Sequence, residues 1–419
     1  MFENVLYQNA SVLIADDIAH GALPSSLLFA GPPASGKLTC ALELARILAC
    51  RSAEARGAWN CACPSCLKHK ALMHSGLLLT GFRASTLEIA AARQTLVEAA
   101  RVNAPYLASV RYLFLRSVRK LTARFSPVLW ADDDKASKIS PLVASVDEAL
   151  EELDPSRPLP EPAALEKATA KLASLCEKLD AGFVSGSVPV AHIRHISSWA
   201  RFTVAEGKKT VIIENADRMQ EGARNALLKV LEEPPEDAVF VLLTEKRSAV
   251  LPTILSRVRT YQFGERTAQE QAEVLLRVFH ASPAEGDDPS AQGERGIERY
   301  LRSFLPTDAN AVSKLGNDFA AEAIRGSVPD VRAAVAAAKN FEPRLLLDSF
   351  FDGFYRCLRS IRVGLSAQEN PYGFAFATER EHFFLHQMAE CYSRITTYNQ
   401  TPTAALEQLA QELATYGNG

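Results

Sequence analysis

The sequence contains no long hydrophobic run. Its longest apolar stretches, such as Ala238–Leu243, have the length of one β-strand, whereas a membrane-spanning helix needs at least ~18 apolar residues. Met1–Asn4 also lacks the basic start of a secretory signal, and no apolar signal segment follows it. These absences lead us to expect a cytoplasmic protein that makes no contact with a membrane.

Charge of one sign and cysteine are also scarce. The 46 basic and 49 acidic side chains give a net charge of −3, which excludes a globally basic nucleic-acid binder. Eight cysteines are too few for a disulfide scaffold in 419 residues, and four of them lie within residues 50–66, which favours a metal site. Hydrophobic residues make up 47% of the chain, enough for a packed core. At ~150 residues per domain, we expect about three domains.

Strand and helix patterns alternate in two separate sections of the chain. The apolar segment 26–30 is followed by a Gly/Pro loop and by a helical pattern from 37 to about 50. After residue 188 the alternation resumes, with apolar strands predicted at 210–213 and 238–244 and a helix at 221–233 between them. This order predicts an α/β module with a parallel sheet flanked by helices.

Residues 84–188 interrupt that alternation. Arg83–Arg124 carries eight basic and two acidic side chains, whereas Ala131–Asp180 carries six basic and twelve acidic ones. The net charges of +6 and −6 favour a helical insert whose two halves pack on each other. A dedicated binding arm is the alternative, although charge runs usually mark solvent-exposed faces.

A phosphate-binding loop lies between the first predicted strand and the next helix. Gly31 and Gly36 allow the backbone to curl around phosphate oxygens, and Lys37 can reach the terminal phosphates. The position after the lysine, where such loops carry the Mg²⁺-binding Ser or Thr, holds Leu38. Thr39 lies about 100° further round the helix and cannot simply replace it. The loop is therefore either a degenerate nucleotide site or a turn that keeps only the shape, and binding of ATP with Mg²⁺ is doubtful.

A second nucleotide-site pattern ends the strand at 210–213. An apolar strand followed by two acidic residues usually holds the metal and activates water. Glu214 here takes the metal position, and Asn215 takes the position of the general base, where an amide cannot accept a proton. Loss of a general base costs on the order of 10²–10⁴ in rate. The alternative is that Glu214 and Asp217 are ordinary strand-end and helix-cap residues.

Two longer motifs carry a family resemblance. Asn225–Glu236 (NALLKVLEEPPE) and Leu251–Arg257 (LPTILSR) closely resemble the bacterial DNA polymerase III clamp-loader subunits, and among these the delta-prime type. The resemblance extends over residues 1–80 and 188–265, applies to the C-terminus only in its helical character, and does not include 84–188.

The resemblance implies a fold, a domain order and partners. Residues 1–264 would form an AAA+ P-loop module, with a zinc module at 50–66 and the helical insert at about 84–188. A helical lid at 265–340 and an all-α collar at 341–419 would follow. Family members assemble through the collar into a hetero-pentameric ring with other clamp-loader subunits, which loads the sliding clamp onto primer-template DNA.

The resemblance also assigns a role to one arginine. Ser256 and Arg257 match the family's Ser-Arg-Cys motif, with Val258 in place of the cysteine. In the family this arginine reaches in trans into the ATP site of a neighbouring subunit. Its planar, permanently charged fork suits the spreading charge of the γ-phosphate. The alternative is a surface arginine at the end of a helix.

The clustered cysteines match the family's zinc module. Cys50, Cys61, Cys63 and Cys66 can supply four thiolates to a tetrahedral structural zinc, and Cys63-x-x-Cys66 has the spacing of a zinc knuckle. The gap between Cys61 and Cys63 is one residue shorter than the usual pattern. Four reduced thiols without metal are the alternative.

Two functional hypotheses follow. The chain is either a non-hydrolysing clamp-loader subunit, acting as scaffold and arginine donor without ATPase activity of its own, or an active ATPase such as a motor subunit. Asn215 separates the two, because a motor subunit is expected to carry Glu at that position. Both defects, at Leu38 and at Asn215, affect hydrolysis and favour the first hypothesis.

Overall fold

The computed structural model describes residues 1–81, 85–183, 187–202, 207–281, 296–305, 309–331, 343–363, 378–396 and 400–416. The chain divides into two compact units, Met1–Leu301 and Arg302–Gly419. In the described residues no helix is both long and apolar enough to cross a membrane.

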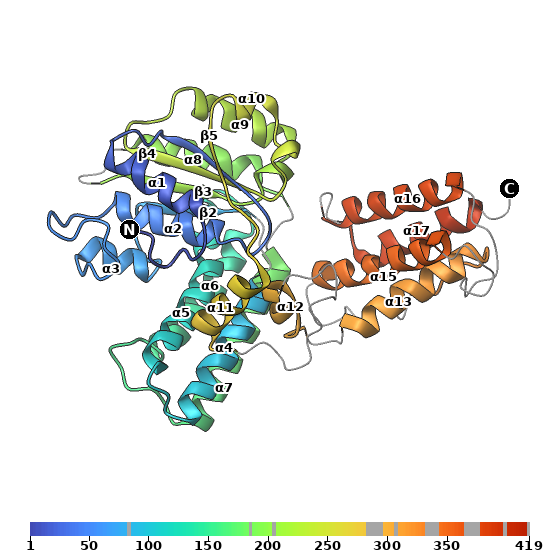
Figure 1. The fold of residues 1–419 in the computed structure, drawn as a ribbon, viewed down its shortest axis with the longest axis horizontal. Coiled ribbons are helices and arrows are strands. Elements are labelled where there is room, and N and C mark those ends of the chain that lie inside the picture. The colour runs from blue at the N-terminus through green and yellow to red at the C-terminus, as the bar shows by residue number, and fades with distance from the viewer. Residues whose placement is uncertain are drawn as a thin grey trace. The chain divides into compact units, whose positions relative to one another are not determined.

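The first unit contains every strand of the described chain and most of its helices (Figure 1). Its elements in chain order are α1 (Asn9–Ala19), β1 (Ser26–Ala30), α2 (Lys37–Leu48), α3 (Pro64–Lys70), β2 (Leu77–Thr80), α4 (Thr86–Arg101), α5 (Leu107–Thr122), η1 (Ala123–Phe125), α6 (Ala136–Glu151), α7 (Pro162–Phe183), α8 (Val190–Arg201), β3 (Lys209–Ile213), η2 (Ala216–Arg218), α9 (Glu221–Glu232), β4 (Ala238–Thr244), η3 (Arg247–Ala249), α10 (Pro252–Leu255), β5 (Arg259–Gln262), α11 (Ala268–Phe279) and α12 (Gly296–Arg302).

The five strands form one parallel sheet in the order β2-β3-β4-β1-β5. β1 lies between β4 and β5, with Ser26 opposite Phe240 and Leu27 opposite Arg259. The predicted parallel α/β module is therefore confirmed, and the strands at 26–30 and 238–244 have the predicted bounds. Because all strands run the same way, their carboxyl ends share one edge of the sheet, where parallel α/β folds place ligands.

Helices cover both faces of this sheet, and alternate strand residues face opposite ways. Leu27 and Phe29 of β1 belong to the core cluster that contains α1 and α2. Leu28 and Ala30 belong to the other cluster, which contains α4 to α9. Every residue of β1, β3 and β4 is buried, as expected of a parallel sheet covered on both sides.

The helices α4 to α7 pack together into a bundle beside the sheet (Figure 1). α4 contacts α7, the basic α5 contacts both α6 and α7, and Arg101 of α4 pairs with Glu166 of α7 at 2.7 Å. The expectation that the two halves pack on each other is therefore confirmed. One ion pair, Arg101–Glu166, joins the two halves among the described residues.

Every described element of the second unit is a helix, as expected for an all-α C-terminal region. The helices are α13 (Ala309–Ile324), α15 (Pro343–Val363), α16 (Thr378–Thr396) and α17 (Pro402–Tyr416). They share a core rich in phenylalanine, in which Phe319 and Phe350 meet edge to face with ring centroids 5.4 Å apart.

The expected lid at 265–340 is divided between the two units. α11 and α12 begin in the first unit, whereas α13 belongs to the second. Residues 282–295, 306–308 and 332–340 lie outside the described part of the chain. The division into a module, a lid and a collar stays a prediction.

Substitution of the buried Arg111 tests how much the stability of the bundle depends on its internal polar contacts. Arg111 on α5 donates from Nε to the Leu153 carbonyl at 2.9 Å, and its Nη2 donates to the carbonyls of Asp154 and Arg157. We predict that Arg111→Met lowers the free energy of unfolding by about 1–3 kcal/mol, because it leaves inward-facing carbonyls without donors.

Arg101→Met is the matched control. The Arg101–Glu166 pair has side chains 55% and 48% exposed, so its loss should cost less than about 1 kcal/mol. Denaturant titration of both variants measures the difference, and equal effects would contradict the importance of the Arg111 contacts.

Candidate nucleotide and metal sites

The phosphate-binding loop has the predicted place, between β1 and α2. Gly36 caps α2 with φ of 91°, a backbone conformation that side chains rarely adopt. A Cβ at Gly31 would lie 2.4 Å from the carbonyl oxygen of Phe263, so only glycine allows this close approach of two backbones. The loop therefore keeps the shape of a phosphate-binding loop.

Basic side chains and backbone oxygens fill the loop. Lys37 is buried and its Nζ donates to the Gly31 carbonyl at 2.6 Å and to the Pro32 carbonyl at 2.5 Å. Arg266 donates from Nη1 to the Ala34 carbonyl at 2.6 Å. A hollow beside Pro32–Ser35 and Arg266 encloses about 10 Å³, room for about one water molecule.

The residues after the lysine supply no metal ligand to this loop. Leu38 is 4% exposed and packs in the core cluster between α2 and the sheet. Thr39 is half-buried, one position further along α2. An active nucleotide site carries at this position a hydroxyl that binds Mg²⁺. This chain carries the side chain of Leu38, which packs in the core.

Glu214 follows β3 at the carboxyl edge of the sheet, as predicted for a metal-binding carboxylate. Its side chain is 6% exposed and forms an ion pair with Arg124 of η1, which is 4% exposed. Asn215 adopts a left-handed conformation with φ of 53°, and Asp217 accepts a hydrogen bond from the Thr244 hydroxyl at 2.6 Å. The groups at 31–39 and at Glu214 thus do not fit a magnesium nucleotide in this conformation.

Arg257 lies at the surface just after the short helix α10. Its Nη2 pairs with Glu232 of α9 at 2.6 Å, and its Nη1 donates to the Thr253 carbonyl at 2.8 Å and to the Ser256 hydroxyl at 3.2 Å. The Ser256 hydroxyl in turn donates to the Thr253 carbonyl at 3.0 Å. Ser256 therefore orients the guanidinium of Arg257, whose side chain is 33% exposed.

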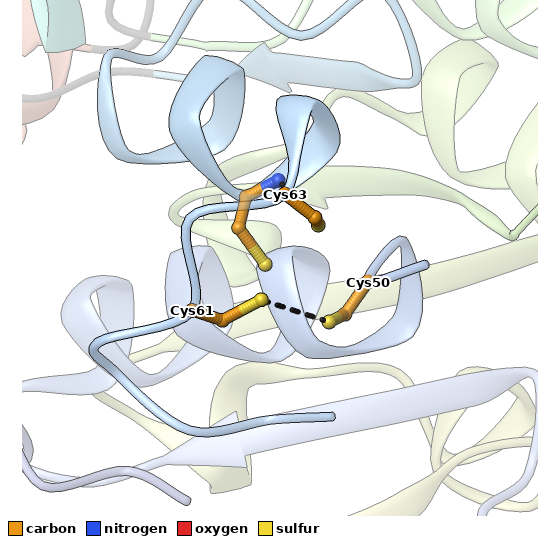
Figure 2. Close-up of side chains that lie close together, drawn as sticks. Cys50, Cys61 and Cys63 are labelled. Carbon is orange, nitrogen blue, oxygen red and sulfur yellow. Dashed lines mark hydrogen bonds between the residues drawn. The ribbon is translucent and has the colours of Figure 1, made fainter. Parts of the chain in front are cut away.

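The four predicted cysteines form one cluster. Their sulfur atoms all lie within 4.8 Å of one another, and those of Cys50 and Cys61 are 3.7 Å apart. Figure 2 shows Cys61 and Cys63 directing their sulfurs toward the same space, with Cys50 across from them at the end of α2. Metal–sulfur bonds of about 2.3 Å in a tetrahedron imply sulfur separations of about 3.8 Å, so the cluster matches a four-thiolate metal site.

The environment of the cluster lowers the pKa of Cys50 and Cys63, whereas burial raises the pKa of Cys66. Burial raises the pKa of Cys63, but hydrogen bonds from the backbone N–H groups of Cys66 and Arg51 outweigh it and lower the pKa to about 6. Cys63 caps α3 and accepts from the Cys66 N–H at 3.4 Å. The gap between Cys61 and Cys63 is one residue shorter than usual, yet the four sulfur atoms still converge.

Arg46 of α2 anchors the cysteine cluster by hydrogen bonds. It is 1% exposed and pairs with Glu43 through Nε at 2.9 Å and Nη2 at 2.6 Å. Its remaining N–H groups donate to the carbonyls of Gly57 and Ala58 and to the sulfur of Cys66. One arginine thus joins the helix of the phosphate-binding loop to the cysteine loop.

Sequence reasoning missed the partners of these predicted residues. Arg124, Arg266 and Arg46 carry no motif, and each acts on a group more than ten residues away in the chain. The net charge of the segment that contains Arg124 was the one available signal, and it does not distinguish an inward-facing arginine from a solvated one.

The fold and the sites together define a class of protein. A parallel sheet with a phosphate-binding loop after its inner strand β1 and a surface Ser-Arg pair are typical of an ATPase-like module of the AAA+ kind. A family model described as "DNA polymerase III, delta subunit" matches residues 7–127 and 166–267, more than half of the chain. The chain belongs to this family.

The family match extends further than the sequence resemblance. It includes α4, α5 and most of α7, all of which lie in the expected insert at about 84–188. The segment that the family model leaves unmatched in this region is 128–165, which contains α6.

Curated relatives are similar over short stretches. DNA polymerase III subunit delta′ of Pseudomonas aeruginosa is 42% identical over 79 residues, 19% of this chain and 24% of that protein. The same subunit of Bacillus subtilis is 50% identical over 56 residues, 13% of this chain and 17% of that protein. The chain thus spans a quarter or less of these relatives' length, and the matches support the delta-prime type of clamp-loader subunit.

One solved structure is similar in sequence at a low level. A gamma subunit-related protein of DNA polymerase III from Thermotoga maritima is 18% identical, with a TM-score of 0.26, over 59% of this chain and 89% of that chain.

The contacts of Arg46 generate a prediction about metal affinity. Because Arg46 positions Cys66 and the loop at Gly57, we predict that Arg46→Met weakens metal binding by about 10- to 100-fold, the usual effect of removing a group that orients a ligand. Competition with a chromogenic chelator, using Zn²⁺ or Co²⁺, measures this affinity.

Arg56→Met is the matched control, since Arg56 lies in the same loop but is exposed. Its affinity should stay within about twofold of the starting protein. Equal affinities for the Arg46 and Arg56 variants would show that Arg46 does not position the cluster.

Proposed function

We propose that this chain is a non-hydrolysing subunit of the replicative clamp loader. In this proposal it acts as a rigid scaffold and donates Arg257 in trans to the ATP site of a neighbouring subunit. Together with the other subunits of a hetero-pentameric ring, it takes part in loading the sliding clamp onto primer-template DNA in the cytoplasm.

One contrast within the chain carries the proposal. The groups that would hydrolyse ATP are engaged internally: Lys37 with its own loop, Leu38 with the core and Glu214 with Arg124. Arg257 is instead at the surface, in a pair with Glu232. A subunit with a closed site and an accessible arginine suits donation to another site better than hydrolysis of its own.

Release of Arg257 from its ion pair with Glu232 costs little free energy. A partly exposed ion pair such as Arg257–Glu232 contributes at most about 1 kcal/mol, because water screens both charges. An arginine that stabilises the γ-phosphate in trans is worth on the order of 10³–10⁵ in rate, about 4–7 kcal/mol. Breaking the pair with Glu232 therefore costs less than the transition-state stabilisation that Arg257 would supply at the neighbour's phosphate, and Ser256 keeps the guanidinium oriented until then.

We also propose that the four-cysteine cluster holds a structural zinc. Cys50, Cys61, Cys63 and Cys66 offer four thiolates and leave no open position for substrate, which is typical of structural zinc. The metal would tie the loop after α2 to the start of α3.

The zinc proposal predicts a metal content. Protein purified without chelator should contain about one zinc per chain by elemental analysis, because four converging thiolates bind zinc tightly. Cys63→Ser should lower that content, whereas Cys40→Ser, at a buried cysteine outside the cluster, should not. Fully folded protein that contains no metal would contradict the proposal.

The proposed lack of hydrolysis predicts the result of a phosphate-release assay. The isolated chain should release phosphate from ATP no faster than Lys37→Ala protein, because Leu38 supplies no metal ligand and Asn215 cannot act as the base. Steady turnover that Lys37→Ala abolishes would identify the chain as an active ATPase and would support the alternative of a motor subunit.

The proposed role of Arg257 predicts a loss of activity in the assembled ring. Arg257→Ala should leave the chain folded and able to assemble, yet slow ATP hydrolysis at one neighbouring site by about 10³-fold or more. Arg257→Lys should restore little, because an ammonium lacks the planar fork. Single-turnover hydrolysis and clamp loading measure both effects.

Arg259→Ala is the matched control. Arg259 is also partly exposed and also pairs with one carboxylate, that of Asp17 at 2.9 Å, but it lies on β5 outside the Ser-Arg motif. Rings that carry Arg257→Ala and work as fast as the Arg259→Ala rings would refute the assignment, and Arg257 would then be an ordinary surface residue.

A further inference from the structure

We propose that Arg266 is an internal latch that keeps the phosphate-binding loop closed to nucleotide. Its guanidinium holds the loop to the N-terminal segment and to the start of α11, so the loop opens only when these contacts break. The inference rests on the proposed function and adds a regulatory element to it, because residues 31–37 would then form a latent nucleotide site that the chain itself keeps closed.

Arg266 lies where three segments of the chain meet. It comes between β5, which borders β1 in the sheet, and Thr267, the N-cap of α11. Its Nε and Nη2 donate to the Leu6 carbonyl at 3.1 and 2.9 Å, and its Nη1 donates to the Ala34 carbonyl at 2.6 Å. Arg266 is 8% exposed. One buried guanidinium thus joins the N-terminal segment, the phosphate-binding loop and the helix that follows β5.

The backbone of the loop is shaped around this guanidinium. Ala34 has a φ of 52°, a left-handed conformation that is costly for any residue except glycine. Such a conformation persists only where the surroundings impose it, and the hydrogen bond from Arg266 to the Ala34 carbonyl is one such constraint. A Cβ at Gly36, the N-cap of α2, would lie 3.1 Å from Nη2 of Arg266. Arg266 therefore contacts the loop on both sides of Ser35.

The same arginine is joined to the helices that follow β5. Gln271 of α11 donates from Nε2 to the Arg266 carbonyl at 3.0 Å, and its Oε1 accepts from the Ile297 N–H of α12 at 3.3 Å. Gln271 and Ile297 also line the small hollow beside the loop, so α11 and α12 border the loop here. The latch thus couples the conformation of the loop to the position of these two helices.

The far end of α11 is held independently of the latch. A hydrogen bond of 3.2 Å joins the Thr95 hydroxyl of α4 to the Phe279 carbonyl. The ring of Tyr106 stacks on that of His280, the C-cap of α11, with centroids 3.6 Å apart. Loss of the latch should therefore free the loop and the start of α11 while the module stays folded.

The latch lowers the affinity of the loop for phosphate groups. Hydrogen bonds from a charged donor are about twice as strong as those between neutral groups, and a ligand that needs the open loop must break them. The apparent affinity then falls in proportion to the fraction of molecules that are open. Lys37 adds to the closed state, because it donates to the carbonyls of Gly31 and Pro32. Two cations that could bind phosphate are thus bound to carbonyls of the loop itself.

Arg266→Lys tests the latch without removing its charge. An ammonium keeps the positive charge but lacks the planar fork that reaches two carbonyls in fixed directions. We expect amide hydrogen exchange at residues 34–37 to become about tenfold faster, and binding of ADP in Mg²⁺-free buffer to become about tenfold tighter, because the open fraction rises. Arg266→Met should speed the exchange equally. Mass spectrometry and calorimetric titration of the full-length chain measure the two effects.

Arg277→Lys is the matched control. Arg277 also lies on α11, but its side chain is 58% exposed and pairs with Glu273 at 2.5 Å on the same helix. Its loop exchange and its affinity for ADP should stay within about twofold of the starting protein, since an exposed ion pair contributes little. Exchange in β4, which is buried at every position, should remain slow in every variant and so show that the module is folded.

Two outcomes would overturn the inference. One is a folded Arg266→Lys protein whose loop exchanges as slowly as that of the starting protein, or that binds ADP no more tightly. The other needs no variant: loop amides of the starting protein that ADP protects from exchange, which would show that the loop already accepts nucleotide. Neither outcome concerns Arg257 or hydrolysis, because Leu38 and Asn215 are unchanged, so the proposed function fails or stands on the ring and phosphate-release assays alone.

Discussion

A parallel sheet buried on both faces leaves only its two edges for polar chemistry, and this constraint places the groups of the candidate nucleotide site. β1, β3 and β4 are buried at every position, so the polar side chains that follow them gather at the carboxyl edge. The phosphate-binding loop, Glu214 and Asp217 all lie there. At this edge Arg124 and Glu214 form a buried ion pair.

Helix α2 connects the two candidate sites. Gly36 and Lys37 form its beginning in the phosphate-binding loop, and Cys50 follows its end. Twelve helical residues span about 18 Å, so the loop and the cysteine cluster are separate sites on one rigid element. Arg46 strengthens the link because its guanidinium joins α2 to both the cysteine loop and Cys66.

Much of the fold could be predicted from local patterns. The strands at 26–30 and 238–244 are apolar runs bounded by turns, and the structure has them at the predicted residues. The strands β2 and β5 were missed, because four residues are too few for a periodic pattern. β5 also has exposed residues at Arg259 and Gln262, as expected at the edge of a sheet, where burial does not select apolar side chains.

The sequence by itself determined where the chemistry-bearing residues stand: the loop at Gly31–Lys37, the clustered cysteines, the Ser-Arg pair and the two substitutions at Leu38 and Asn215. These depend on spacing along the chain, which local turns and helices preserve. Only the tertiary structure decided their partners. Arg124 meets Glu214 across 90 residues, and Arg266 meets Ala34 across 232. Such pairs form because two surfaces of the fold meet, and no local pattern marks an arginine that faces inward.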